Sequence, residues 1–380
     1  MSDQRARGRG TPRGAEGSWR ARGRGKGRGS TSPSSSWHTN GPIQRDASVS
    51  ANPTASASVS FRRRMDLMAS VSRSSGLEKD GDDLKNYKTQ EEYKHFIKEK
   101  VESIFKDHAR SVSESEDDKK RRIDSQENVL ILFRKLREGV SSSNRNDAFA
   151  LETYETSLYL SALFDSPKQT ISIIPHLLPV RHEDPPKFTS HSPSGYSVMI
   201  SLLHHLVAQY PSQGTYFQQR NSLPSGLLHT YSEGMEWLAS LTKSLRFRNY
   251  AKFAMLTQRS HVMALLQRFS DNDKAAYNSQ TGLKSDSDLA IKAILNLLDS
   301  LRKKVSETAW TIIRATYREL SCDSTPNETG AWLSRSLCLE NLLDSRFSVD
   351  AERWLVDKIP IGHVRRKEGV EGKWVVCKVR

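Results

Sequence analysis

The chain has 380 residues, enough for two domains of ordinary size or one long helical domain. Its formal net charge is +14, from 58 basic and 44 acidic side chains, which indicates a polyanionic partner. No stretch approaches the roughly 18 continuous apolar residues that a membrane span needs, and the N-terminus lacks the apolar core of a signal peptide. We therefore expect neither a membrane protein nor a secreted one.

The positive charge is concentrated in an N-terminal tail. Residues 1–64 carry thirteen Lys/Arg and three Asp/Glu, a net charge of +10, whereas the remaining residues carry 45 and 41, a net charge of +4. Residues 1–60 have almost no aliphatic side chains, so they cannot bury enough apolar area to offset the entropy of ordering. We predict a disordered basic tail and linker over residues 1–88. The body is near neutral, and its charge gives little support for a nucleic-acid surface.

Arginine and glycine alternate in two segments of this tail, residues 5–10 and 20–29. Glycine leaves the backbone free to follow an irregular phosphate path, and arginine donates bidentate hydrogen bonds and stacks on bases. The pattern predicts weak, salt-sensitive RNA binding; the alternative is a solvated tail that improves solubility or serves as a nuclear address. The tail residues predicted to bind nucleic acid are Arg7, Arg9, Arg22, Arg24, Lys26 and Arg28.

From residue 90 onward, apolar residues recur at three- and four-residue spacing, which predicts a body made almost entirely of helices. The helices follow one another in pairs without a repeat strict enough to name, so we predict an irregular helical-repeat stack over residues 89–328. The predicted helices cover residues 93–105, 129–136, 149–163, a two-turn segment from Ser166, 195–210, 226–244, 246–256, 260–269, a run from Ser285 to Leu301, and a partner helix at 310–317.

The segment 111–122 interrupts this pattern with acidic residues followed by Lys119-Lys120-Arg121-Arg122. Its polarity predicts a solvated loop between helices. The basic run has two interpretations that stay open: a nuclear localisation element, or a charge run that neutralises the acidic residues before it.

The last fifty residues change character. A short apolar helix is predicted at 329–343, and a second one follows Ser348. Two strands, 363–367 and 373–380, flank a glycine-bearing turn and predict a hairpin. Helix, helix, hairpin is the order of a winged helix, so we predict a winged-helix-like subdomain over residues 329–380 that caps the stack.

Basic side chains are frequent in this predicted wing. One interpretation is a nucleic-acid-binding face, and the other is an ordinary polar strand face whose lysines discourage edge pairing. The wing residues that we consider for nucleic-acid binding are Arg365, Arg366, Lys367 and Lys373.

Catalytic and metal-binding patterns are not found in the sequence. Cys322, Cys338 and Cys377 are odd in number and too widely spaced for a zinc ribbon, which favours reduced thiols in an intracellular protein. No nucleophile elbow, phosphate loop, dinucleotide fingerprint or paired-histidine metal motif occurs. We predict that the chain is not an enzyme and has no cofactor and no metal. An enzyme on a helical scaffold would need a polar pocket around His204 and His205, with His182 nearby.

Three stretches carry a family resemblance: 133–140 (FRKLREGV), 149–155 (FALETYE) and 245–253 (LRFRNYAKF). Together with the winged end at 329–380, they resemble the PCI-domain superfamily, and within it the GANP-type scaffolds of messenger-RNA export. The resemblance covers roughly residues 125–380. It implies a nuclear scaffold that binds a small acidic subunit and a second PCI protein, with nucleic acid held across paired winged helices.

These observations give one leading hypothesis and one alternative. The leading hypothesis is a non-enzymatic nuclear scaffold that binds RNA and protein partners in messenger-RNA processing or export. The alternative is a PCI-like subunit of a cytoplasmic assembly, such as a proteasome lid, a signalosome or a translation initiation factor. In either case the specific function is expected in the helical body and its wing, because an Arg-Gly tail strengthens binding without selecting a sequence.

Overall fold

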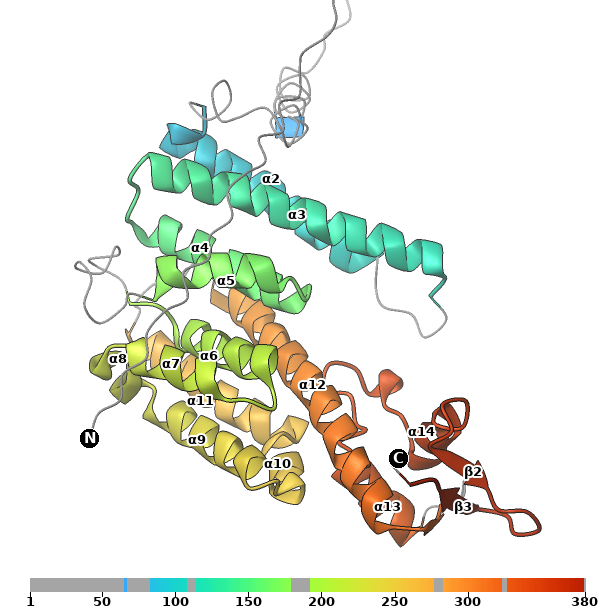
Figure 1. Cartoon of the computed structure of the whole chain (residues 1–380). Coiled ribbons are helices and arrows are strands. Elements are labelled where there is room, and N and C mark those ends of the chain that lie inside the picture. The colour runs from blue at the N-terminus through green and yellow to red at the C-terminus, as the bar shows by residue number, and fades with distance from the viewer. Residues whose placement is uncertain are drawn as a thin grey trace, which may run out of the picture. The chain divides into compact units, whose positions relative to one another are not determined.

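The computed structural model describes residues 65–66, 83–107, 114–178, 192–276, 283–322 and 327–378, with the backbone alone for 270–276 and 283–285. Most of the predicted tail and linker, including the six candidate RNA-binding residues, lies outside the described residues. The prediction of disorder up to residue 88 is wrong at its end, because a 3-10 helix covers Asp83–Lys85, an α-helix begins at Tyr87, and Leu84 is buried. The described residues belong to one compact unit, residues 53–380. This unit is mostly helical (Figure 1), which confirms the predicted helical class.

Helices that follow one another in the chain also pack against one another. The elements of this helical body are η1 (Asp83–Lys85), α2 (Tyr87–Asp107), α3 (Glu116–Ser142), α4 (Ala148–Leu163), α5 (Pro167–Leu177), α6 (Gly195–Gln209), α7 (Gly214–Ser222), α8 (Ser225–Thr230), α9 (Ser232–Arg246), α10 (Tyr250–Leu256), α11 (Arg259–Ala276) and α12 (Leu283–Thr316). Contacts join α2 to α3, α3 to α4, α4 to α5, α6 to α7 and α9 to α10. Helix α12 returns over a long sequence distance to pack on α4 and α6, and α11 also contacts α6.

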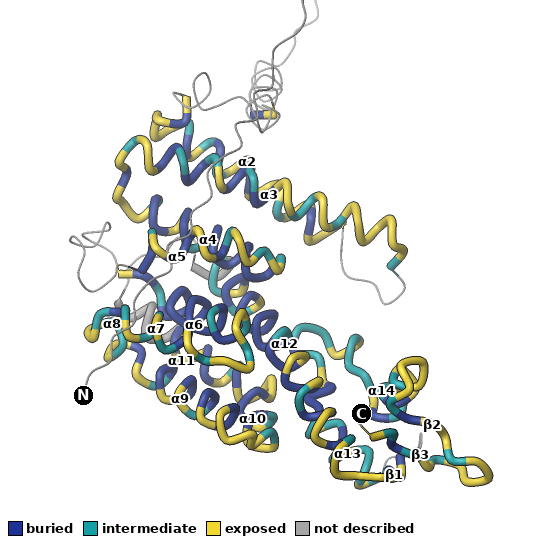
Figure 2. Tube along the Cα trace, in the orientation of Figure 1, coloured by how far each residue is buried: buried dark blue, intermediate teal, exposed yellow. Residues whose placement is uncertain are grey.

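Helix α3 begins at Glu116, so the loop predicted for residues 111–122 is wrong from that residue on. Ser115 caps the helix because its side chain accepts a hydrogen bond from the backbone N–H of Asp118. Acidic residues fill the first turn, where the helix dipole favours negative charge. The N-terminal half of α3 is nevertheless mostly exposed (Figure 2), which explains why its composition looked like that of a loop.

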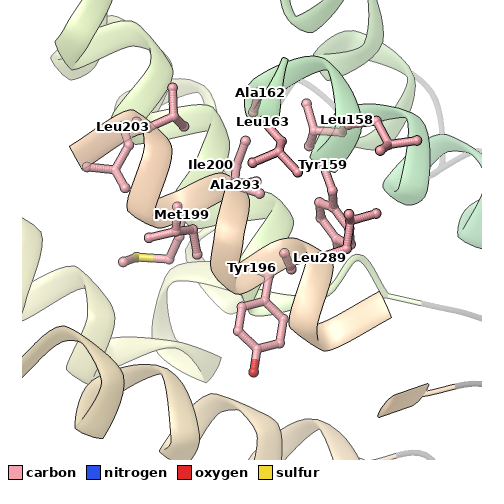
Figure 3. Packing of buried hydrophobic residues seen from close by; sticks show 14 of the residues in the cluster. Leu158, Tyr159, Ala162, Leu163, Tyr196, Met199, Ile200, Leu203, Leu289 and Ala293 are labelled. Carbon is pink, nitrogen blue, oxygen red and sulfur yellow. The ribbon is translucent and has the colours of Figure 1, made fainter. Parts of the chain in front are cut away.

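The main hydrophobic core lies where α4, α6 and α12 meet (Figure 3). Leu158 on α4 and Met199 on α6 are fully buried there, and Ala293 on α12 lets the helices approach closely. Full burial of one such aliphatic side chain contributes roughly 1.5–3 kcal/mol. Helix α5 continues through Pro175 to Leu177, whereas two turns were predicted; the proline lies in its last turn and ends it shortly afterwards.

Helix α12 is one continuous helix of 34 residues, so the predicted break before a partner helix at 310–317 is wrong. No glycine or proline occurs between Leu301 and Trp310, and the residues there are mostly good helix formers. Over residues 226–244, by contrast, one helix was predicted and two are present, because Tyr231 separates α8 from α9. Apolar periodicity therefore located these helices without fixing where they end.

The chain ends in a second, smaller core around a three-stranded antiparallel sheet. Its strand order is β1-β3-β2, with Leu320 opposite Trp374 and Val364 opposite Val376. The predicted hairpin is confirmed, whereas β1 was not predicted because three residues are too few to show alternation. The elements of this region are β1 (Glu319–Ser321), α13 (Glu328–Ser336), η2 (Ser345–Phe347), α14 (Ala351–Asp357), β2 (Val364–Arg366) and β3 (Lys373–Val376).

Candidate interaction site in the C-terminal subdomain

We use the term C-terminal subdomain for residues 317–322 and 327–378, which share the second core with the end of α12. Trp310 of α12 and Trp374 of β3 are the largest side chains in that core, and both are fully buried. Each indole N–H finds an acceptor: Trp310 donates to Nδ1 of His363 at 3.2 Å, and Trp374 to the carbonyl of Cys322 at 2.6 Å. Burial, together with the charge of Arg314, lowers the pKa of His363, which favours the neutral ring that accepts this bond.

A buried polar cluster joins this subdomain to the helical body. Asp299 of α12 accepts hydrogen bonds from the backbone N–H groups of Leu342 (3.0 Å) and Leu343 (3.4 Å), in the segment that follows α13. One turn along α12, Arg302 donates to the carbonyl of Thr257 at 2.7 Å and to that of Glu340 at 3.2 Å. Because Asp299 and Arg302 are both buried, the cluster fixes how the segment 340–343 lies on α12.

The four wing residues considered for nucleic-acid binding have different surroundings. Arg366 lies over the ring of Trp374, 5.1 Å from its centroid, and 3.5 Å from a carboxylate oxygen of Glu352 on α14. Lys367 donates to both carboxylate oxygens of Glu319, at 2.9 and 3.0 Å, and this bond lowers the pKa of Glu319.

The other two, Arg365 and Lys373, are exposed. By the strand register, Arg365 is opposite Val375, and Val375 is opposite Glu319. Lys373 lies two residues before Val375 on β3, so it shares this outer face of the sheet. The outer face therefore brings three of the four predicted side chains together beside one acidic residue, whereas Arg366 lies on the other face.

Helix α14 is the last helix before the hairpin, and its surface is not basic. Asp350 caps it by accepting from the N–H of Arg353, and Glu352 and Asp357 add two more acidic groups. Lys358 at its end pairs with Glu307 of α12 at 2.9 Å. This charge pattern disfavours the approach of phosphates along α14 and leaves the wing as the more positive side.

Exposed aliphatic side chains follow α14. Val356 is 39% exposed, and Ile359 and Ile361, in the turn that leads to β2, are 38% and 56% exposed. Three aliphatic side chains within six residues form an apolar surface of the kind that a protein partner covers. The sequence alone does not single them out, because apolar composition does not show which side chains the fold leaves at the surface.

An open cleft of about 350 Å³ lies between β1, which is an edge strand of the sheet, and α13. Tyr317 and Trp332, whose ring centroids lie 5.4 Å apart, line it together with Glu319 and Glu328. The backbone N–H and C=O groups of Glu319 and Ser321 point away from β3, because the flanking residues make the bonds to that strand. Such an edge can accept an extended segment of a partner.

The histidine pair considered for an enzyme site is part of the helical core. His204 on α6 is 5% exposed, its ring lies 5.7 Å from that of His205, and burial lowers its pKa to about 4. The third residue, His182, lies outside the described residues. Within the described residues, no group of three or more His, Cys, Asp or Glu side chains is arranged to hold a metal ion. A neutral, buried imidazole in this setting serves packing.

The basic run 119–122 lies in the first turns of α3 and is paired with the acidic residues around it. Arg122 donates two hydrogen bonds to Glu114, at 2.8 and 3.1 Å, and Lys119 lies 3.4 Å from Glu116. These pairs support self-neutralisation, which was one of the two interpretations of the run.

Comparison with known proteins gives no match to any family model, any curated protein or any solved structure. None of the described helices combines the length and the apolar character that a bilayer-spanning segment requires. The resemblance to the PCI superfamily therefore rests on the sequence stretches quoted above and on the element order of the C-terminal subdomain.

Proposed function

We propose that this protein is a non-enzymatic nuclear scaffold of the PCI type that binds RNA and protein partners in messenger-RNA processing or export. The observation that carries the proposal is the element order at the C-terminal end. The end of α12 is followed by β1, α13, α14, β2 and β3, and the sheet order is β1-β3-β2. This is the order of a winged helix, and it continues directly from a stack of helices, as in PCI proteins.

The protein-binding part of the proposal is supported by the apolar surface of Val356, Ile359 and Ile361. A second PCI protein, paired through its own winged helix, is the partner that the resemblance implies, together with a small acidic subunit. The RNA-binding part is supported by the Arg-Gly composition of the tail and by the outer face of the sheet with Arg365 and Lys373. The tail supplies affinity in this proposal, and the body supplies the choice of partners.

Capture of the tagged full-length chain from cells tests the proposal, with the bound proteins and RNA identified. We expect a PCI protein and a small acidic protein with the parent chain, and their loss with the double substitution I359D/I361D. The matched control is I171D, which changes an isoleucine that is 53% exposed on α5, away from the subdomain. Recovery of no PCI protein, no acidic subunit and no RNA would refute the scaffold function.

Localisation separates the leading proposal from its alternative. A fluorescent fusion of the full-length chain is expected in the nucleus. A steady cytoplasmic signal, with capture of subunits of a proteasome lid, a signalosome or an initiation factor, would instead support the cytoplasmic PCI-like subunit.

A further inference from the structure

The near-neutral charge of the body hides a strongly basic segment. Residues 237–270 contain six Lys/Arg and no Asp or Glu. Two of the six have structural partners: Arg268 forms an ion pair with Glu233, and Arg259 donates to the carbonyls of Leu342 and Leu343. The other four lie at the junction of α9 and α10, namely Lys243, Arg246, Arg248 and Lys252.

These four side chains are exposed, and an exposed aromatic residue, Phe247, lies among them in the sequence. Phe247 is 66% exposed, the highest fraction of any large apolar side chain given for the described residues, and the guanidinium of Arg246 lies 5.6 Å from its ring centroid. Lys243, Arg246 and Phe247 share one face of the last turn of α9, because their spacing is three and four residues. In the described part of the chain, no ion pair engages the four basic groups. We use the term α9–α10 basic surface for these four basic residues together with Phe247. The outer edge of both helices is exposed (Figure 2).

The turn that builds this surface holds an arginine where helices usually place glycine. Asn249 donates its backbone N–H to the carbonyl of Ser244 at 2.8 Å, and Arg248 donates to that of Leu245 at 3.1 Å. These two bonds define a Schellman motif, whose turning residue adopts the left-handed conformation. Arg248 occupies that position with φ of 54°, a conformation that disfavours any side chain with a Cβ. Arg248 therefore holds an exposed charged side chain at a position that glycine would suit better, and no ion pair engages it among the described residues.

We propose that the α9–α10 basic surface binds single-stranded nucleic acid. In this arrangement the four cations contact successive phosphates, and one base stacks on the ring of Phe247. An exposed phenylalanine among arginines favours single strands over duplexes, because a duplex keeps its base faces stacked inside the helix. An acidic peptide would use the four charges but would gain little from the aromatic face, so we favour nucleic acid.

This surface is separate from both places where the proposed function puts RNA. The candidate RNA-binding residues of the tail belong to residues 7–28, and the outer face of the wing is formed by β1, β2 and β3 rather than by α9 and α10. The inference therefore does not require the chain to be a PCI scaffold, and each of the two proposals can fail alone.

Binding of a fluorescein-labelled 15-nucleotide uridine RNA to the full-length chain tests the inference. To lower the background from the tail, the parent protein carries glutamine in place of Arg7, Arg9, Arg22, Arg24, Lys26 and Arg28. Fluorescence anisotropy is measured at salt concentrations from about 50 to about 200 mM, a range over which the affinity due to phosphate contacts falls steeply. The substitution F247A is expected to weaken binding about tenfold, within the usual range for loss of one stacked base.

The charge of the surface is tested by R248G and by the triple substitution R246Q/R248G/K252Q. Glycine suits the left-handed turn better than arginine does, so R248G is expected to keep or raise the melting temperature while it weakens binding. The slope of log affinity against log salt should fall in magnitude by about 0.7 for R248G and by about 2 for the triple variant. The control K168E reverses an exposed charge on α5 and should leave both the affinity and the slope near those of the parent.

The result that would overturn the inference is RNA binding that these substitutions do not change, or no RNA binding by the tail-substituted parent. A labelled 15-residue polyglutamate peptide provides the comparison with an acidic protein. Tight peptide binding that depends on the four cations but not on Phe247 would also overturn it, in favour of an acidic protein partner. Neither outcome would alter the partner capture that tests the scaffold function.

Discussion

Arg145 joins three parts of the helical body through one guanidinium group. Its Nε donates to Asp147 at 2.8 Å, Nη1 to Gln90 at 3.2 Å, and Nη2 to Glu91 at 2.8 Å. The group lies over the ring of Phe149, 3.9 Å from its centroid, and only 6% of the residue is exposed. Only a planar guanidinium group with several N–H donors can reach all these acceptors at once. The ammonium group of a lysine cannot replace it.

We therefore expect R145K to lower the free energy of unfolding by roughly 2–3 kcal/mol, because the buried Gln90 oxygen loses its donor. Urea denaturation of the full-length chain measures this loss. The control is R134K, which changes an exposed i,i+4 pair with Glu138 and should cost less than about 0.5 kcal/mol. Equal stability of R145K and the parent would contradict this account of the site.

His204 predicts how stability depends on pH. Burial lowers its pKa from 6.5 to about 4, with a smaller contribution from the neighbouring His205, so the folded protein keeps the ring neutral. Below pH 6.5 the unfolded chain takes up a proton that the folded chain does not, and the stability contributed by this residue is lost as the pH falls toward 4. The loss is up to about 1.4 kcal/mol for each pH unit in that window.

The substitution H204L removes this titration while it keeps an apolar side chain on α6. Between pH 7 and pH 5 the parent is expected to lose up to about 2 kcal/mol more stability than H204L, as measured by urea denaturation at both pH values. An equal loss in the two proteins would show that the imidazole does not resist protonation in the folded state.

At the scale of elements, sequence patterning succeeded where a helix has one buried stripe and clear ends. Helices α4 and α6 were predicted with nearly their observed ends, and α2 was located with its first turns missing, because each has apolar residues at helical spacing next to a polar or capping segment. The start of α3 was missed because its first turns are exposed, so that only a cap and charges mark them. Strand β1 was missed because its position depends on pairing with β3, which lies more than fifty residues away.

The candidate site was predicted in part for the same reason. Composition indicated the wing and its basic side chains, but not that Arg366 would lie against Trp374 and Glu352 or that Lys367 would pair with Glu319. Such pairings depend on strand register and on helix docking, which a single sequence does not specify. The exposed Ile359 and Ile361 were missed on the same grounds.

The segment 340–343 depends on α12 through Asp299. In D299A the N–H groups of Leu342 and Leu343 lose their acceptor, and we expect a cost of roughly 2–4 kcal/mol, expressed first in the C-terminal subdomain. Hydrogen–deuterium exchange should show faster uptake in residues 339–376, with α4 and α6 unchanged. The control is D288A, an exposed position on the same helix. Uniform acceleration along the chain, or none, would contradict a local role for Asp299.

At the scale of the whole molecule, the two cores share α12. Leu298 and Leu301 belong to the main core, and Ala309, Trp310 and Ile313 belong to the second. Since no loop separates these positions, the second core cannot unfold without exposing the end of a helix on which the first depends. The net charge of the body is also a property of the whole molecule. Its sum is close to zero and therefore gives no sign of the α9–α10 basic surface.

We expect the helical body and the C-terminal subdomain to unfold in one transition. Four of the five tryptophans in the described residues lie in the second core or the subdomain, at 310, 332, 354 and 374, so tryptophan fluorescence reports mainly on that region. Far-ultraviolet circular dichroism reports mainly on the helices of the body. The two urea curves should coincide; a fluorescence transition clearly earlier than the loss of helix would show that the cores unfold independently.

The continuity of α12 also has a mechanical consequence. A helix of 34 residues spans about 50 Å, and it enters the second core without a glycine, a proline or a turn where it could bend. A force that a bound partner applies to the wing is therefore transmitted through α12 to the helical body, because α12 has no hinge between the two cores. A partner bound to the C-terminal subdomain is therefore held in a fixed orientation relative to α4 and α6.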